Sequence, residues 1–120
     1  MLDCVLIGAG GFIGTVLRYL IGCIPVKGGS PFPWKTLLIN VAGAFLIGIV
    51  TALAAKNRSL SPHLVLMLKV GVCGGFTTFS TFAYENAGLI RNGQWTFAVL
   101  YIMLSIVPGI LAVFAAQTLI

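Results

Sequence analysis

The stretch that decides the fold is Gly71–Phe82, which reads GVCGGFTTFSTF and lies inside a long apolar segment. It combines paired glycines with three threonines, a serine and three evenly spaced phenylalanines. Glycine weakens a helix by about 1 kcal/mol relative to alanine, and threonine is only a modest helix former. The stretch therefore predicts a helix that breaks around Gly74–Thr78 and then resumes.

A helix break inside a membrane exposes backbone amides and carbonyls, each of which costs several kcal/mol unless it is satisfied. Such a break persists only where it is buried in protein or faces a polar path or an ion. The alternative is a continuous, kinked helix whose small residues serve packing. The placement of Phe76, Phe79 and Phe82 among hydroxyl groups favours a permeation site.

Composition identifies the chain as a membrane protein. Of its 120 residues, 59% are hydrophobic and only 8% are charged, whereas a soluble domain is about 25% charged. This composition excludes a soluble enzyme. The net charge of +5 comes from dispersed basic residues, so it does not indicate a nucleic-acid partner. The expected partner is the lipid bilayer, in which the chain would be a multi-pass protein.

Four apolar segments have the length that a bilayer requires. They lie near residues 4–24, 34–55, 64–90 and 95–119, with short polar connections. We therefore expect an all-α membrane protein in which residues 1–120 form a single four-span channel domain with a broken third helix. An even number of spans places both termini on one side.

Polar residues within the spans are the candidate functional residues. Arg18 either reaches the interface from a span end or attracts an anion in a vestibule. Asn40 either bonds to a neighbouring helix, for about 1 kcal/mol, or presents N–H groups to an anion. Glu85 is the only acidic residue inside a span, which marks it as functional unless it lies at the interface beside Asn86 and Arg91.

Basic residues are divided almost evenly between the two sides of the predicted membrane topology. Four lie on the side of the first and third loops and three on the other, so the positive-inside rule fixes no orientation. A chain without a fixed orientation can insert both ways, and the two forms can pair around an axis in the membrane plane, as inverted repeats do. Four helices barely enclose a polar path, which also favours a homodimer.

These residues resemble the Fluc/CrcB family of fluoride channels over essentially the whole chain. The resemblance is carried by Gly10–Gly14 with Arg18 and Tyr19, by Asn40 with Gly43 and Gly48, and above all by GGFTTFSTF at positions 74–82. It implies a non-enzymatic, fluoride-selective channel that exports fluoride passively from the cytoplasm. It also implies an antiparallel, dual-topology homodimer with two pores and a central structural sodium ion.

The resemblance also implies roles for particular residues. The backbone carbonyls of Gly74 and Thr77 would hold the sodium ion, and Arg18 would belong to the vestibule. The fluoride path would be lined by Asn40, Phe79, Phe82, Ser80, Thr81, Glu85, Tyr101 and Ser105. Gly109 falls where some family members have a serine, which leaves the fourth-span end of the polar track without that hydroxyl.

The chemistry of this residue set suits fluoride. Asn40, Ser80, Thr81 and Tyr101 can replace the water of a strongly hydrated anion with N–H and O–H donors. Aromatic ring edges are electropositive, so Phe79 and Phe82 could attract the anion without trapping it, as conduction requires.

Two other functions fit the length and span count. A small dual-topology multidrug exporter needs a membrane-embedded carboxylate, usually in the first span, and this chain offers only Glu85. A non-transporting accessory subunit would leave the polar cluster of the third span unexplained.

Overall fold

The computed structural model describes residues 1–120 and is helical throughout, without strands. Its helices, in chain order, are α1 (Leu2–Gly22), α2 (Trp34–Lys56), α3 (Pro62–Leu66), η1 (Met67–Cys73), α4 (Gly74–Phe76), α5 (Phe79–Arg91) and α6 (Trp95–Leu119). Four stretches are long and apolar enough to cross a membrane: α1, α2, Pro62–Arg91 and α6. The expected all-helical, four-span class is confirmed, with each span end within two residues of its predicted position.

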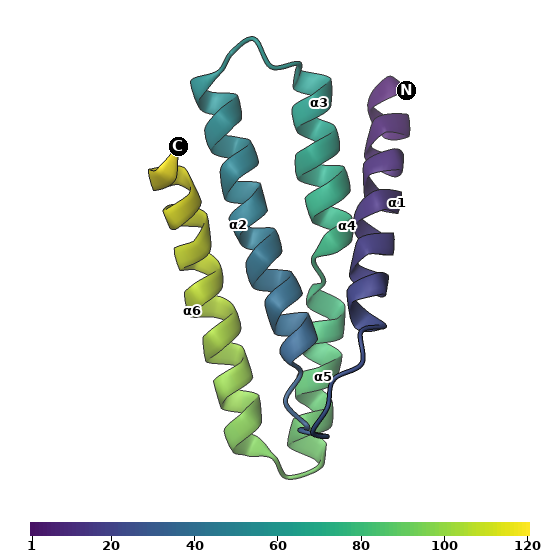
Figure 1. The fold of residues 1–120 in the computed structure, drawn as a ribbon, viewed down its shortest axis with the longest axis vertical. Coiled ribbons are helices and arrows are strands. Elements are labelled where there is room, and N and C mark those ends of the chain that lie inside the picture. Colours follow the sequence, from purple (N-terminus) through teal and green to yellow (C-terminus); the bar gives the residue numbers. More distant parts are fainter.

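The four spans lie side by side in a helix bundle that measures 51 × 30 × 23 Å (Figure 1). The third span lies between α1 and α2, and α6 packs along the other side of α2. Both chain termini and the loop between α2 and α3 lie at one end, and the other two loops lie at the opposite end. We call this opposite end the loop-1 end.

The third span is interrupted at Thr77 and Thr78, about halfway along its length in Figure 1. Thr77 has φ −83° and ψ 157°, and Thr78 has φ −148° and ψ 118°, so both are extended. Gly74 and Gly75 remain helical. The predicted break is therefore present, but it occupies only the threonine end of the expected interval.

The glycines before the break serve close packing against α1. A Cβ on Gly75 would lie 2.6 Å from the carbonyl oxygen of Gly11, and one on Gly10 would lie 2.6 Å from that of Met67. A Cβ on Gly14 would collide with the Val72 carbonyl oxygen and lie 2.8 Å from the Phe76 nitrogen. Small residues let two backbones approach in lipid, and here they bring α1 against the first half of the third span.

The third span contains a π-helical segment that the sequence did not predict. Met67–Cys73 is π-helical, with wider turns than the α-helix on either side. Such segments are rare and frequently lie at functional sites. In this chain the segment lies directly before the short helix α4, which ends at the break.

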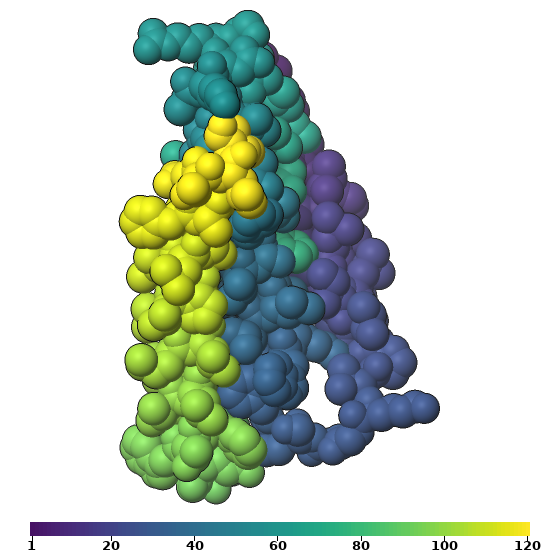
Figure 2. Space-filling model, turned by 60° about the vertical axis from the view of Figure 1, so that its left-hand side comes forward, coloured from purple at the N-terminus to yellow at the C-terminus, as the bar shows by residue number.

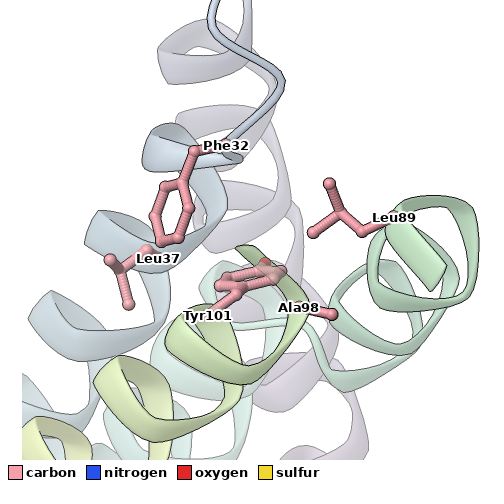
Figure 3. Close-up of a cluster of buried hydrophobic side chains, with 5 residues drawn as sticks. All are labelled: Phe32, Leu37, Leu89, Ala98 and Tyr101. Atoms are coloured by element: carbon pink, nitrogen blue, oxygen red, sulfur yellow. The ribbon is translucent and has the colours of Figure 1, made fainter. Parts of the chain in front are cut away.

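A small apolar cluster closes the loop-1 end (Figure 3). It contains Phe32 from the first loop together with Leu37, Leu89, Ala98 and Tyr101 from three spans. The Phe32 and Tyr101 rings meet edge to face with centroids 5.6 Å apart. Only 16 of 120 residues are buried, so most apolar side chains of this chain remain available to lipid or to another subunit.

Gly14→Ala tests the close packing of α1 on the third span. The added methyl group meets backbone atoms that cannot move independently, so we expect destabilisation of about 1–3 kcal/mol. The readout is the thermal unfolding midpoint of the detergent-solubilised protein. Gly8→Ala is the matched control: a Cβ there has open space, and alanine favours the helix by up to about 1 kcal/mol. Equal midpoints for both variants would contradict the close approach.

Candidate functional site

The side chain of Asn40 satisfies both backbone groups of Thr78 at the break. Its Nδ2 donates to the Thr78 carbonyl oxygen at 3.0 Å, and its Oδ1 accepts from the Thr78 amide at 2.8 Å. A carboxamide carries a donor and an acceptor side by side, so it can donate to the carbonyl and accept from the amide of the same residue. Of the two functions expected for Asn40, bonding to a neighbouring helix is present, and one N–H of Nδ2 remains for another acceptor.

The C-terminal end of α4 is held by α1. Arg18 donates from Nε to the Gly75 carbonyl oxygen at 3.1 Å, and the Thr15 hydroxyl donates to the same oxygen at 3.4 Å. A cation is favourable at a helix C-terminus because the helix dipole is negative there. Arg18 therefore reaches inward to the break, and its two terminal amino groups remain free of hydrogen bonds within the chain.

Two carbonyl groups at the break have no ordinary partner. The amide that would bond to the Gly74 carbonyl in a continuous helix belongs to Thr78, and it bonds to Asn40 instead. The Thr77 carbonyl accepts no hydrogen bond within the chain, because the amide of Thr81 donates to the Thr78 hydroxyl instead. No cluster of His, Cys, Asp and Glu side chains suitable for a metal is present. A cation at this place would therefore depend on backbone oxygens.

The helix resumes behind a side-chain cap. The Thr78 hydroxyl accepts the amide of Thr81 at 3.2 Å, which is the usual arrangement at a helix N-terminus. The same hydroxyl lies 3.1 Å from that of Thr81 and 3.5 Å from that of Ser80. The hydroxyl groups of Thr78, Ser80 and Thr81 are thus gathered on one turn.

Glu85 receives a hydroxyl donor on each carboxylate oxygen. The Thr36 hydroxyl donates to Oε2 at 3.1 Å and the Tyr101 hydroxyl donates to Oε1 at 2.9 Å. The Tyr101 side chain is fully buried, and Thr36 is 8% exposed. Glu85 therefore lies between α2 and α6, where it is partly exposed. Thr36 was missed, although its i, i+4 relation to Asn40 on α2 was a usable signal.

Phe79 and Phe82 project from the first turn of α5. Their ring centroids are 5.9 Å apart with an interplanar angle of 44°. Phe82 also meets Tyr101 edge to face at 4.9 Å. Phe79 is 78% exposed in the single chain, so one ring belongs to the bundle and the other faces outward.

Two of the hollows in the chain border the break at Thr78. One, of about 320 Å³, is lined by Asn40, Thr78, Phe79, Phe82 and Ser105 among others. The Ser105 hydroxyl is buried and has no hydrogen-bond partner. The second, of about 510 Å³, lies between α1, α2 and α5 and is lined by Arg18, Thr36, Thr78, Thr81 and Glu85 among others; we call it the vestibule.

The vestibule and the smaller hollow share Thr78. Most of the predicted site residues line one of these two hollows. Arg18, Thr81 and Glu85 line the vestibule, and the smaller hollow is lined by Asn40, Phe79, Phe82 and Ser105. Tyr101 is joined to this set through Glu85, and Ser80 through Thr78. The arrangement offers polar donors on both sides of a discontinuous helix.

Asn40→Ala tests the attachment of α2 to the break. The change leaves the amide and the carbonyl of Thr78 unpaired, each at a cost of about 1–3 kcal/mol. We expect a clearly lowered thermal unfolding midpoint in detergent. Asn92→Ala, at an exposed asparagine of the last loop, is the control and should leave the midpoint unchanged. An Asn40→Ala protein as stable as the parent would show that Thr78 does not depend on Asn40.

Comparison with known proteins places the chain in a family. It is 44% identical over 119 residues to a protein of Chlorobaculum tepidum, covering 99% of this chain and 94% of that one. It is 42% identical over 120 residues to a protein of Agrobacterium fabrum, covering 99% and 96%. Both relatives carry the name Fluoride-specific ion channel FluC. Residues 5–117 match the family model described as CrcB-like protein, Camphor Resistance (CrcB), and the chain therefore belongs to the CrcB family.

Proposed function

We propose that this chain forms a fluoride-selective channel through which fluoride leaves the cytoplasm passively. The observation that carries the proposal is that two hollows both border Thr78, where hydroxyl and amide groups line both sides of a broken membrane helix. The relatives named as fluoride channels supply the choice of ion. The chain acts as a multi-pass membrane channel and not as an enzyme.

Fluoride holds its water strongly, so a pore must offer donors in exchange. The free N–H of Asn40 and the Ser105 hydroxyl lie in the same hollow, and Ser105 has no partner within the chain. Thr81 and Ser80 extend the row of hydroxyl groups from the break. These groups are neutral, so they can replace water without holding the anion as a fixed charge would.

The two phenyl rings occupy the same hollow as these donors. A ring presents positive potential at its edge and negative potential at its face. The tilt between Phe79 and Phe82 lets an anion move from one ring edge to the next. In the proposed mechanism the rings stabilise the ion only weakly, and they exclude larger, more weakly hydrated anions by shape.

Glu85 controls which hydroxyl groups are free to serve the anion. Each hydroxyl has a single proton, and those of Thr36 and Tyr101 are directed at the Glu85 carboxylate. Tyr101 therefore donates to fluoride only when Glu85 gives up that bond. The carboxylate in turn has its charge stabilised by two donors, which lowers its repulsion of a passing anion.

The proposed assembly is an antiparallel homodimer with two pores. The near balance of basic residues between the two sides supports insertion in both orientations, and the exposed apolar surface of the single chain supports burial against another subunit. The free carbonyls of Gly74 and Thr77 support a structural sodium ion held by both subunits, because backbone oxygens are ligands for a hard cation. The ion would neutralise the carbonyl dipoles at the break.

Passive export follows from the acidity of hydrogen fluoride. The neutral acid crosses the bilayer and ionises at cytoplasmic pH, and the resulting anion then needs a path outward. No energy source is required, because the anion flows down its own gradient.

Fluoride efflux from reconstituted vesicles, followed with a fluoride-selective electrode, tests this function. We expect rapid efflux from vesicles that contain the protein. Phe79→Ile and Phe82→Ile should each reduce it by at least about tenfold, because ring-edge stabilisation of about 1.4 kcal/mol or more is lost. Phe114→Ile, at an exposed phenylalanine of α6, should conduct normally. A parent protein without fluoride efflux would contradict the proposal, and it is the result that a proton-coupled drug exporter would give.

Sodium content tests the central ion separately. After exhaustive desalting, atomic emission should find one sodium per two chains, because an ion held by buried carbonyls from both subunits exchanges slowly. Unfolding in denaturant should release it. A folded, fluoride-conducting dimer that contains no sodium would remove the ion from the account and leave the channel function standing.

A further inference from the structure

Lys35 is a fixed positive charge in the wall of the vestibule. It lies at the first turn of α2, and its Nζ donates to the Gly22 carbonyl oxygen at the end of α1, at 2.9 Å. That carbonyl accepts no backbone hydrogen bond, because the amides that follow α1 bond to earlier residues. This hydrogen bond holds the ammonium group of the flexible Lys35 side chain beside the end of α1. Two of the three N–H groups of the ammonium remain free.

Lys35 belongs to two hollows at once. It lines the vestibule together with Arg18 and Glu85, and it lines a hollow of about 390 Å³ beneath the first loop. Thr36 and Glu85 are the other residues common to both. Figure 2 shows a gap in the surface at this end, bordered by the blue atoms of the loop after α1 and the start of α2. Lys35 and the Glu85 carboxylate thus line the same two hollows.

The charges in the vestibule pose an electrostatic problem for an anion channel. Glu85 is negative and lines this hollow as well as the one beneath the first loop. Arg18 is positive, but its Nε is bonded to the break. Lys35 forms no ion pair with Glu85, since the chain's one close ion pair joins Asp3 and His63 at the other end. Its charge therefore remains available to an anion in the hollow.

We propose that Lys35 is an anion-attracting site at the mouth of the path, where it concentrates small monovalent anions in the vestibule and offsets the repulsion from Glu85. Lys35 and Arg18 together outweigh Glu85 in this hollow, and a cleft of net positive charge raises the local concentration of anions. The inference rests on the proposed channel function for its consequence, faster fluoride uptake into the pore. The local potential itself can be measured without any fluoride flux.

Cys23 provides the probe, because it is exposed and lines the same vestibule as Lys35. In a chain carrying Cys4→Ser and Cys73→Ala, Cys23 is the only thiol. The experiment compares the rates at which an anionic and a cationic methanethiosulfonate modify this thiol, in the full-length protein. The ratio of the two rates reports the sign and size of the local potential.

Lys35→Gln should lower the anionic-to-cationic rate ratio by about fivefold at about 10 mM ionic strength, where the Debye length is about 30 Å. The difference should shrink to less than about twofold near 1 M, where the Debye length is about 3 Å. Lys35→Arg should retain the parent ratio. Arg58→Gln, which removes one charge from the loop at the opposite end of the chain, controls for a general loss of positive charge and should change the ratio by less than about twofold.

Fluoride efflux of the same variants, on the otherwise unchanged chain, completes the test. Lys35→Gln should slow efflux several-fold at low ionic strength, adjusted with an impermeant salt, and by less than about twofold at high ionic strength. A loss that is equal at all ionic strengths, with an unchanged rate ratio at Cys23, would show that Lys35 only caps α1 and would overturn the inference. A shifted ratio with unchanged efflux would also overturn it. A parent that fails to conduct fluoride would count against the channel function, and the ratio at Cys23 would still decide whether Lys35 attracts anions.

Discussion

The pair of hydrogen bonds between the Asn40 side chain and the Thr78 backbone is the interaction on which the rest of the structure depends. A membrane helix cannot open at Thr77 and Thr78 unless the released groups find partners, because lipid supplies none. Asn40 satisfies one residue completely, and Arg18 with Thr15 satisfies the Gly75 carbonyl from the opposite side. The break is thus held from both neighbouring spans, and the groups left over are carbonyls and hydroxyls suited to ions.

The glycines set the distances between the third span and its neighbouring helices. Because α1 packs so closely on the first half of the third span, Arg18 reaches the end of α4 directly. On the other flank, a Cβ at Gly43 of α2 would collide with the Thr77 side chain, so that glycine brings Asn40 within reach of the break. The vestibule, the smaller hollow and the free carbonyls are consequences of these two approaches.

Much of this arrangement was predictable from the sequence, and the exceptions have physical reasons. The four spans follow from length and hydropathy, and the break follows from the glycines and threonines of the third span. The position of the break within Gly74–Thr78 could not be predicted, because Gly74 and Gly75 lower helix stability locally yet stay helical through packing against α1. The partner of Asn40 depends on the register between two helices, which local sequence does not specify. The hydrogen bond of Thr36 to Glu85 was not predicted, because threonines in apolar spans usually bond to their own helix.

The π-helical segment Met67–Cys73 likewise has no sequence signal that distinguishes it from an α-helix. The roles of the path residues in conduction, and the sodium ion, remain predictions that the geometry supports. What the structure adds is two hollows that both border Thr78, one lined by Lys35 and Arg18 and the other by Ser105, so that the role of each residue can be tested.

Solid-state NMR of the labelled protein in lipid bilayers tests the central claim most directly. The account predicts extended Cα and Cβ chemical shifts for Thr77 and Thr78, helical shifts for Gly74–Phe76 and Phe79–Thr81, and magnetisation transfer between the Asn40 side-chain amide and the Thr78 carbonyl carbon. Helical shifts through all of residues 74–81, without that transfer, would show that the third helix is continuous and would contradict the account.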